Sequence, residues 1–155
     1  MTGRKDGRSP RIVVGVDGSP SSLTALRWAV RQAECTGATL DAVIAWQYPV
    51  NFGTYGWAPV SMEEDGADFG ELAEKTLTDA ISKIVDPGTG VQVHQLVVQG
   101  NPAQVLLDAA RDADLLVVGS RGHGGFTGAL LGSVSLHCVH HAHCPVVVLR
   151  GHVHD

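Results

Sequence analysis

A glycine-rich stretch between an apolar run and a helix-like run constrains this chain more than any other feature. It reads GSRGHGGFTGALLGSVS and covers residues 119–135. The run before it, 115–118, has the length and β-branched content of a buried parallel strand, as does 146–149. Several glycines in one loop let the backbone approach a ligand and expose N–H donors to an anion. The stretch predicts a phosphate cradle; a linker that is merely rich in glycine is the simpler alternative.

The end of this stretch supplies the start of an expected helix. Gly132 and Ser133 precede the run 134–141, and the first N–H groups and the dipole of a helix favour negative charge. The hydroxyls of Ser133 and Ser135 add donors at the same end. A strand-like run before the glycine-rich stretch and a helix-like run after it favour the phosphate cradle over the linker.

Two other nucleotide-binding loops are excluded by the residues. A P-loop needs a lysine at the end of its glycine run, but the lysines are Lys5, Lys75 and Lys83. After the first apolar run, Asp17 stands where a dinucleotide-binding loop requires its second glycine. The chain therefore has the pattern of neither a P-loop NTPase nor an ordinary NAD enzyme.

The whole chain alternates strand-like and helix-like runs, which predicts an α/β domain with a parallel sheet. Ser19 is a good N-cap with Pro20 at the first helical position, and Gly37 is a stop signal for that helix. Asn101, followed by Pro102, is expected to cap a later helix. The other expected elements are strands at 11–16, 40–45, 91–98, 115–118 and 146–149, and helices at 67–85, 101–111 and 134–141. Residues 46–66 are expected to form an irregular loop, whose aromatic side chains either cover a bound base or pack on the neighbouring surface.

Three ordered motifs resemble those of the ATP-binding universal stress proteins. Gly119, Gly122, Gly132 and Ser133 match the pattern G-x2-G-x9-G-[ST]. VVGVDGS at 13–19 is similar to that family's first strand and turn, and CPVVVLR at 144–150 to its last strand. The resemblance covers roughly residues 11–150.

The resemblance implies a fold and an assembly. The expected fold is a single doubly wound domain at 11–150, with a five-stranded parallel sheet in the order 3-2-1-4-5 and helices on both faces. Residues 1–10 are expected to be a disordered leader and 151–155 a short tail. The last strand, 145–150, would be an apolar sheet edge, and the resemblance implies that a homodimer forms there.

The resemblance also implies a nucleotide site at the carboxyl ends of strands 1 and 4, where such sheets bind ligands. Ala45 would contact adenine through its backbone. The ribose and phosphates would be held by Gly15, Val16, Asp17, Val118, Gly119, Arg121, Gly122, Gly132, Ser133, Val134 and Ser135. Arg121 could equally be a solvated surface charge.

Asp17 needs its own account, because a carboxylate repels a polyphosphate unless a cation or a hydroxyl lies between them. A Mg²⁺ ion on the phosphates, or a ribose hydroxyl donating to Asp17, satisfies this requirement. The alternative is that Asp17 only caps the helix turn at Ser19. Beside the glycine stretch, the sequence favours the ligand, and ATP with Mg²⁺ is the expected cofactor.

A histidine cluster near the carboxyl end offers a rival interpretation. His137, His140 and His141 stand at helical spacing, with Cys138, His143 and Cys144 close by, and these residue types bind zinc or copper. However, His137 and Cys138 face different sides of a helix. Surface histidines are therefore the simpler interpretation, with adventitious metal at His152 and His154. A nucleotide-free metal-responsive or protein-interaction module remains the alternative function.

The composition limits the binding partners and the cellular compartment that are expected for this chain. The net charge is −5 over 155 residues, which gives no support to nucleic-acid or anionic-membrane binding. Neither a membrane-spanning run nor an export signal is evident, so a cytoplasmic location is expected. Three cysteines without a C-x-x-C fit reduced thiols better than a disulfide framework.

No catalytic residues are assignable from the sequence. ATP hydrolysis needs a positioned lysine, general base or arginine finger, and none is evident. The sequence therefore predicts a nucleotide-dependent regulatory module of the stress response, with at most slow ATP hydrolysis and unknown protein partners.

Overall fold

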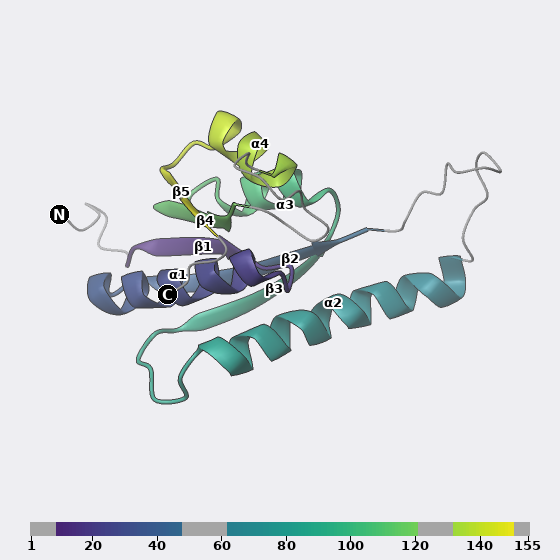
Figure 1. Ribbon diagram of the computed structural model, residues 1–155, viewed down its shortest axis with the longest axis horizontal. Coiled ribbons are helices and arrows are strands. Elements are labelled where there is room, and N and C mark those ends of the chain that lie inside the picture. The colour runs from purple at the N-terminus through teal and green to yellow at the C-terminus, as the bar shows by residue number, and fades with distance from the viewer. Residues whose placement is uncertain (1–8, 48–61, 121–131, 151–155) are drawn as a thin grey trace.

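The computed structural model describes residues 9–47, 62–120 and 132–150. Its sheet has five parallel strands in the order β3-β2-β1-β4-β5, which confirms the expected topology (Figure 1). The order reverses between β1 and β4, so the carboxyl ends of these two neighbours form the switch point of the sheet. The strands are β1 Arg11–Gly15, β2 Thr39–Trp46, β3 Val93–Gln99, β4 Leu115–Gly119 and β5 Val146–Leu149.

Four helices in the described part of the chain cover the two faces of this sheet. They are α1 Pro20–Thr36, α2 Met62–Ile84, α3 Pro102–Ala109 and α4 Ser133–His141. The largest boundary error concerns α2, which begins five residues before the expected 67. Residue 46 and residues 62–66 of the expected loop therefore belong to β2 and α2, and the aromatic residues at 48–57 lie outside the described ranges. No helix in those ranges is long and apolar enough to cross a membrane.

The capping residues read from the sequence act as expected. The Ser19 side chain accepts a hydrogen bond from the Ser22 N–H, and Gly37 ends α1 in the left-handed conformation with φ 76°. Asn101 caps α3 by accepting from the Gln104 N–H at 3.1 Å. These caps fix where α1 begins and ends and where α3 begins, and each involves only residues that are close in the sequence.

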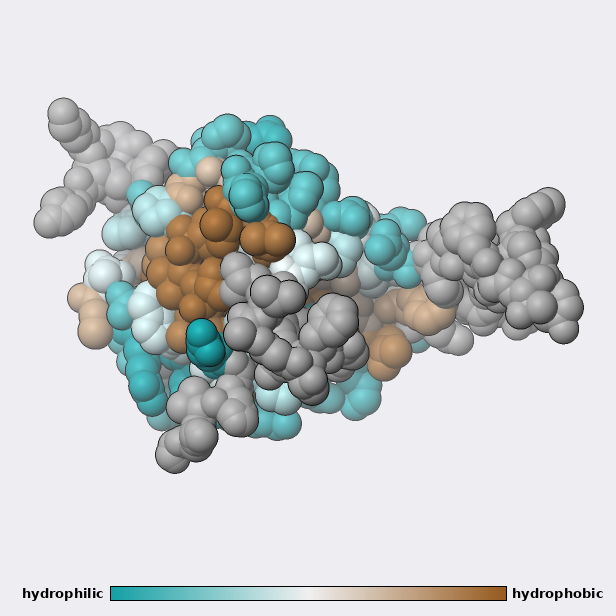
Figure 2. Space-filling view, turned by 45° about the horizontal axis from the view of Figure 1, so that its top comes forward, coloured by the Kyte–Doolittle hydropathy of each residue, from teal (hydrophilic) through white to brown (hydrophobic). Residues whose placement is uncertain are grey.

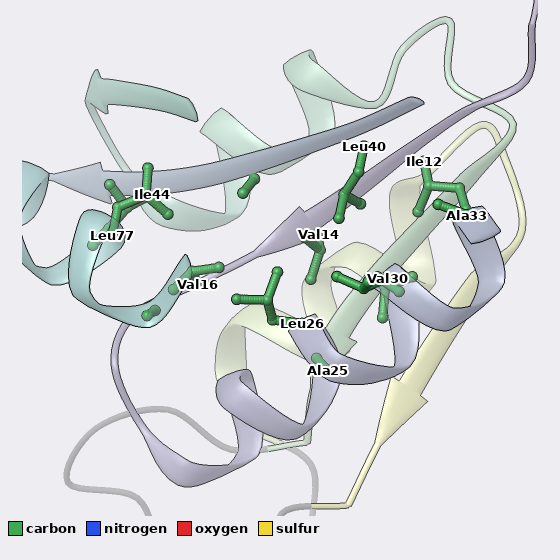
Figure 3. Close-up of a cluster of buried hydrophobic side chains, with 14 of the residues drawn as sticks. Ile12, Val14, Val16, Ala25, Leu26, Val30, Ala33, Leu40, Ile44 and Leu77 are labelled. Atoms are coloured by element: carbon green, nitrogen blue, oxygen red, sulfur yellow. The ribbon is translucent and has the colours of Figure 1, made fainter. Parts of the chain in front are cut away.

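Side chains alternate along the strands and build one apolar cluster on each face of the sheet. Figure 3 shows the cluster between the sheet and helices α1 and α2, where Val14 lies near Leu26 and Ile44 lies beside Leu77. The opposite cluster, under α3 and α4, contains Val13, Val43, Val105, Leu106, Leu116, Val118 and Cys138. Both faces of β1 and β4 are therefore buried, which explains their uninterrupted apolar sequences.

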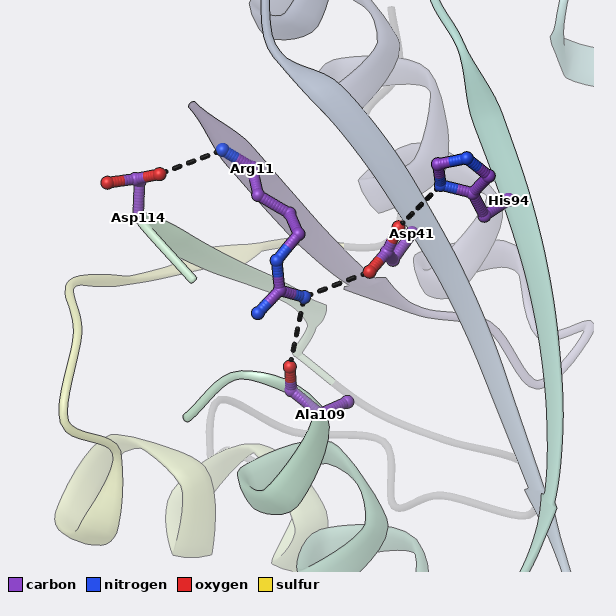
Figure 4. A network of polar contacts seen from close by, with 5 residues as sticks. All are labelled: Arg11, Asp41, His94, Ala109 and Asp114. Carbon is purple, nitrogen blue, oxygen red and sulfur yellow. Dashed lines mark hydrogen bonds and ion pairs between the residues drawn. The ribbon is translucent and has the colours of Figure 1, made fainter. Parts of the chain in front are cut away.

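A polar network links β1, β2 and β3 near their amino ends, at the end of the sheet opposite the switch point (Figure 4). The Asp41 carboxylate, with its side chain only 12% exposed, contacts Arg11 Nη1 at 2.9 Å and His94 Nδ1 at 3.0 Å. Arg11 also donates to the Ala109 carbonyl, and its backbone N–H donates to Asp114. Because buried carboxylates require such partners, this network explains how β2 carries an aspartate in its interior.

Candidate functional site

The candidate site lies at the carboxyl edge of the sheet, where β1 and β4 end side by side. Val14 pairs with Val117, and continuing this register by two residues sets Val16 beside Gly119. On the other side, the Val16 N–H donates to the Val43 carbonyl at 2.9 Å, so β1 stays attached to β2 up to the site. The fold thus brings together the two glycine-containing turns that are far apart in the sequence.

The two ends of the glycine-rich loop meet at this edge. The Gly132 N–H donates to the Ser120 carbonyl at 2.7 Å, and the Ser120 N–H donates to the Leu149 carbonyl at 2.7 Å. The Ser135 hydroxyl is buried and contacts the carbonyl oxygens of Ser120 and Gly132 at 3.2 and 3.1 Å. The loop therefore leaves β4 and returns at the same point, which places the N-terminus of α4 directly beside the end of β4.

The N-terminus of α4 differs chemically from those of α1 and α3. Its N-cap is Gly132, which has no side chain to accept from the first N–H groups, whereas Ser19 and Asn101 cap the other two helices. The Ser133 side chain is exposed at the first position of α4. An external anion is suited to this end, because the helix dipole and its N–H groups both favour negative charge.

The turn after β1 is held by its own side chains. Asp17 Oδ1 accepts from the Ser19 N–H at 2.9 Å, and the Asp17 N–H donates to the Ser22 hydroxyl at 3.1 Å. Gly18 between them takes a positive φ of 85°. The capping role that the sequence allowed for Asp17 is therefore present in the structure, and a ligand role would be additional to it.

Two glycines of the site serve close packing as well. A Cβ on Gly119 would lie 2.7 Å from the backbone carbon and oxygen of Ser21 in α1. A Cβ on Gly15 would lie 2.8 Å from Leu106 Cδ1 in α3. Gly119 thus permits the start of α1 to rest against the end of β4, a reason for glycine that the loop pattern did not predict.

Three other expected site residues belong to the apolar cluster under α3 and α4. Val118 is buried in it, and Ala45 and Val134 are partly buried and pack against it. Arg121 and Gly122 lie outside the described residues. Ser120 and Ser22 were not among the site residues expected from the sequence, although hydroxyl residues directly after a strand and in the first turn of a helix are signals for such a role.

Comparison with known proteins decides the family. The model of the universal stress protein family matches residues 9–150. The chain belongs to the universal stress protein family. A curated relative, universal stress protein Mb2019 of Mycobacterium bovis, is 40% identical over 141 residues. That match covers 90% of this chain and 43% of the relative, so this universal stress protein chain spans less than half of the relative's length.

Solved universal stress protein structures share the fold. UspA from Lactobacillus plantarum gives a TM-score of 0.76 at 22% identity, covering 93% of this chain and 99% of that one. A universal stress protein in complex with cAMP gives a TM-score of 0.57 at 25% identity, covering 93% and 98%. The first similarity concerns the fold alone, whereas the second relative is described with an adenine nucleotide.

Among the described residues of this universal stress protein, the histidines at the end of α4 do not converge with the cysteines. His137, His140, His141 and His143 are exposed, whereas Cys138 is fully buried on the inner side of α4. Within the described ranges, no group of three or more His, Cys, Asp or Glu side chains is arranged to hold a metal ion. The expected separation of His137 from Cys138 is thus confirmed.

The three cysteines are free thiols, as the sequence predicted. Burial raises the pKa of Cys138 to about 11, because the apolar surroundings disfavour the thiolate. Burial, and then the nearby Asp114 carboxylate, raise the pKa of Cys144, while Arg11 acts in the opposite direction. Neither of these two thiols has the lowered pKa that activates a cysteine as a nucleophile.

Proposed function

We propose that this universal stress protein binds an adenine nucleotide, ATP with Mg²⁺, at the carboxyl edge between β1 and β4. The bound nucleotide stabilises one conformation or partner surface, so the protein acts as a regulatory module of the stress response. The observation that carries the proposal is the contact between Gly132 and Ser120. It sets an α4 N-terminus without a side-chain cap beside the carboxyl end of β4, at the switch point of the sheet.

The chemistry of this edge supports a phosphate on one side and a cation on the other. The α4 N-terminus supplies backbone donors and the Ser133 hydroxyl, which suit phosphate oxygens. Asp17 lies at the end of the adjacent β1, where a carboxylate suits Mg²⁺ or a ribose hydroxyl. The relative in complex with cAMP supports the adenine part of the proposal.

The proposal includes slow hydrolysis at most. Binding a polyphosphate does not by itself orient a water molecule for in-line attack. The lysines in the described ranges, Lys75 and Lys83, lie on α2 rather than in the turns that form the site. Turnover at about 1 s⁻¹ or faster, an ordinary enzyme rate, would contradict this part of the proposal.

The test is to denature the purified protein and to measure the nucleotide that it releases, before and after incubation with Mg-ATP. We expect close to one adenine nucleotide per chain. Ser133→Glu should lose it, because its carboxylate would face the phosphates, while the exposed position and the helix dipole keep the fold stable. Ser82→Glu, at an exposed position near the end of α2, is the matched control and should keep its nucleotide.

Two results would contradict the proposed function. One is the absence of nucleotide even after incubation with Mg-ATP, which would favour the nucleotide-free interaction or metal-responsive module. The other is unchanged binding by Ser133→Glu, which would place the nucleotide away from α4.

We further propose that two copies of the chain pair through the edge strand β5. Its four apolar residues, Val146–Leu149, are only partly buried at the end of the sheet. Figure 2 shows a continuous hydrophobic area on the side of the molecule where β5 runs. Leu136 and Val139 of the neighbouring α4 are 45% and 46% exposed and extend the apolar surface. An apolar edge favours pairing with a copy of itself.

Sedimentation at micromolar concentration tests this assembly. The wild-type protein should sediment as a dimer, and Val147→Lys should shift it to a monomer by placing a charge on the paired edge. Val97→Lys, at the opposite edge strand β3, is the matched control and should leave the dimer intact. A monomeric wild type, or equal effects of both substitutions, would contradict dimerisation through β5.

A further inference from the structure

Helix α4 carries histidines at its carboxyl end that the proposed nucleotide site does not use. His137 and His141 are exposed and stand one helical turn apart, at positions i and i+4. Their ring centroids are 4.5 Å apart, with the ring planes tilted by 39°. The two imidazoles therefore already lie side by side on the solvent face of the helix.

This separation matches that of two imidazoles on one metal ion. An ion about 2.1 Å from each bound nitrogen lies about 3.2 Å from each ring centroid. With centroids 4.5 Å apart, the two ring-to-metal directions meet at about 90°, the angle between adjacent ligands in tetragonal sites. The neighbouring pair, His140 and His141, has ring centroids 6.3 Å apart. Two such rings span at most about 6.4 Å across one ion, so this pair could share an ion only in a nearly linear arrangement.

We infer that His137 and His141 form a surface binding site for a divalent transition metal ion, with Cu²⁺ bound more tightly than Ni²⁺ or Zn²⁺. Imidazole suits all three ions, and the order of affinity follows their general preference for nitrogen ligands. Within the described ranges, no third His, Cys, Asp or Glu side chain joins this pair, and the inferred site is one of two protein ligands. The right-angled geometry favours Cu²⁺ and Ni²⁺ over tetrahedral Zn²⁺.

The position of the pair on α4 separates it from the nucleotide site. The metal ion would sit at the carboxyl end of the helix, whereas the phosphates are proposed at the amino end. A positive charge at a helix carboxyl end is favourable. Bridging two residues one turn apart also stabilises a helix of nine residues, because the ion binds the helical form of the chain preferentially.

Calorimetric titration with Cu²⁺, Ni²⁺ and Zn²⁺ tests the inference. The background is the full chain with His152→Ala and His154→Ala, which removes the histidines of the tail. One Cu²⁺ should bind per chain, more tightly than Ni²⁺ or Zn²⁺. His137→Ala and His141→Ala should each weaken Cu²⁺ binding at least about tenfold, since even the loss of an outer partner of a metal ligand costs this much.

His143→Ala is the matched control, because it removes another exposed histidine beyond the end of α4 and should leave the affinity within about twofold. Circular dichroism without metal should show all variants folded alike, since these side chains are exposed. The inference is overturned if His137→Ala or His141→Ala binds Cu²⁺ like the background protein, or if His143→Ala weakens binding equally. The titration is run on nucleotide-free protein, so its outcome is independent of the proposed function.

Discussion

Gly119→Ala is expected to lower the free energy of unfolding by about 3 kcal/mol. The added Cβ would lie 2.7 Å from two backbone atoms of Ser21, and backbone cannot move aside as the end of a flexible side chain can. To relieve the clash, the start of α1 must move away from the end of β4. For a chain of this size, the midpoint of thermal unfolding should fall by about 6–12 °C.

The matched control for this substitution is Gly88→Ala. A Cβ at Gly88 meets nothing within 4 Å, and its φ is not positive, so stability should change by less than about 0.5 kcal/mol. Chemical denaturation of nucleotide-free protein measures both variants without a contribution from ligand. Equal stability of Gly119→Ala and the wild type would show that α1 does not pack against β4 as described.

Gly119 also illustrates what the sequence could and could not predict. Its place in a glycine pattern correctly indicated the end of a strand beside a loop. Its contact with Ser21 was not predictable, because that contact depends on how α1 and β4, far apart in the chain, are placed around the sheet. A local pattern shows that glycine is required without showing every reason for it.

The elements were predictable where local chemistry decides them. Ser19, Gly37 and Asn101 mark helix ends through caps and turns that involve only neighbouring residues. The start of α2 was missed because Gly66 within an acidic, glycine-containing segment resembles a loop, yet the helix begins at Met62. The strand order came from the family resemblance, since alternating strands and helices alone fit several orders.

Polar residues inside strands were the least predictable part of the fold. Asp41 lies inside β2, near its amino end, and nothing near it in the sequence identifies Arg11 and His94 as its partners. The parallel register sets Asp41 directly opposite His94. On the other side it sets Asp41 opposite Val13, and Arg11, two residues before Val13 on the same face of β1, reaches Asp41 with its long side chain. Likewise, the closure of the site by Ser120 depends on the return of the chain to the end of β4.

Asp17 is expected to have two separable roles, which Asp17→Asn and Asp17→Ala distinguish. In the wild type, the Ser19 N–H donates to Asp17 Oδ1 at 2.9 Å. Asparagine keeps an Oδ1 that can accept this hydrogen bond, but it removes the charge. Asp17→Asn should therefore unfold like the wild type and bind Mg-ATP about 10- to 100-fold more weakly, the typical effect of losing a charged interaction. Calorimetric titration and denaturation of the same samples measure the two effects.

Asp17→Ala removes both the charge and the acceptor. It should lose the same affinity and, in addition, about 1 kcal/mol of stability, because the Ser19 N–H loses its partner in the turn. Repeating the titration of wild type and Asp17→Asn without Mg²⁺ separates two ligand roles. If the charge acts through the cation, the difference between them disappears without Mg²⁺; if it accepts from a ribose hydroxyl, the difference persists. Wild-type affinity of Asp17→Asn for Mg-ATP would contradict a role of the Asp17 charge in nucleotide binding.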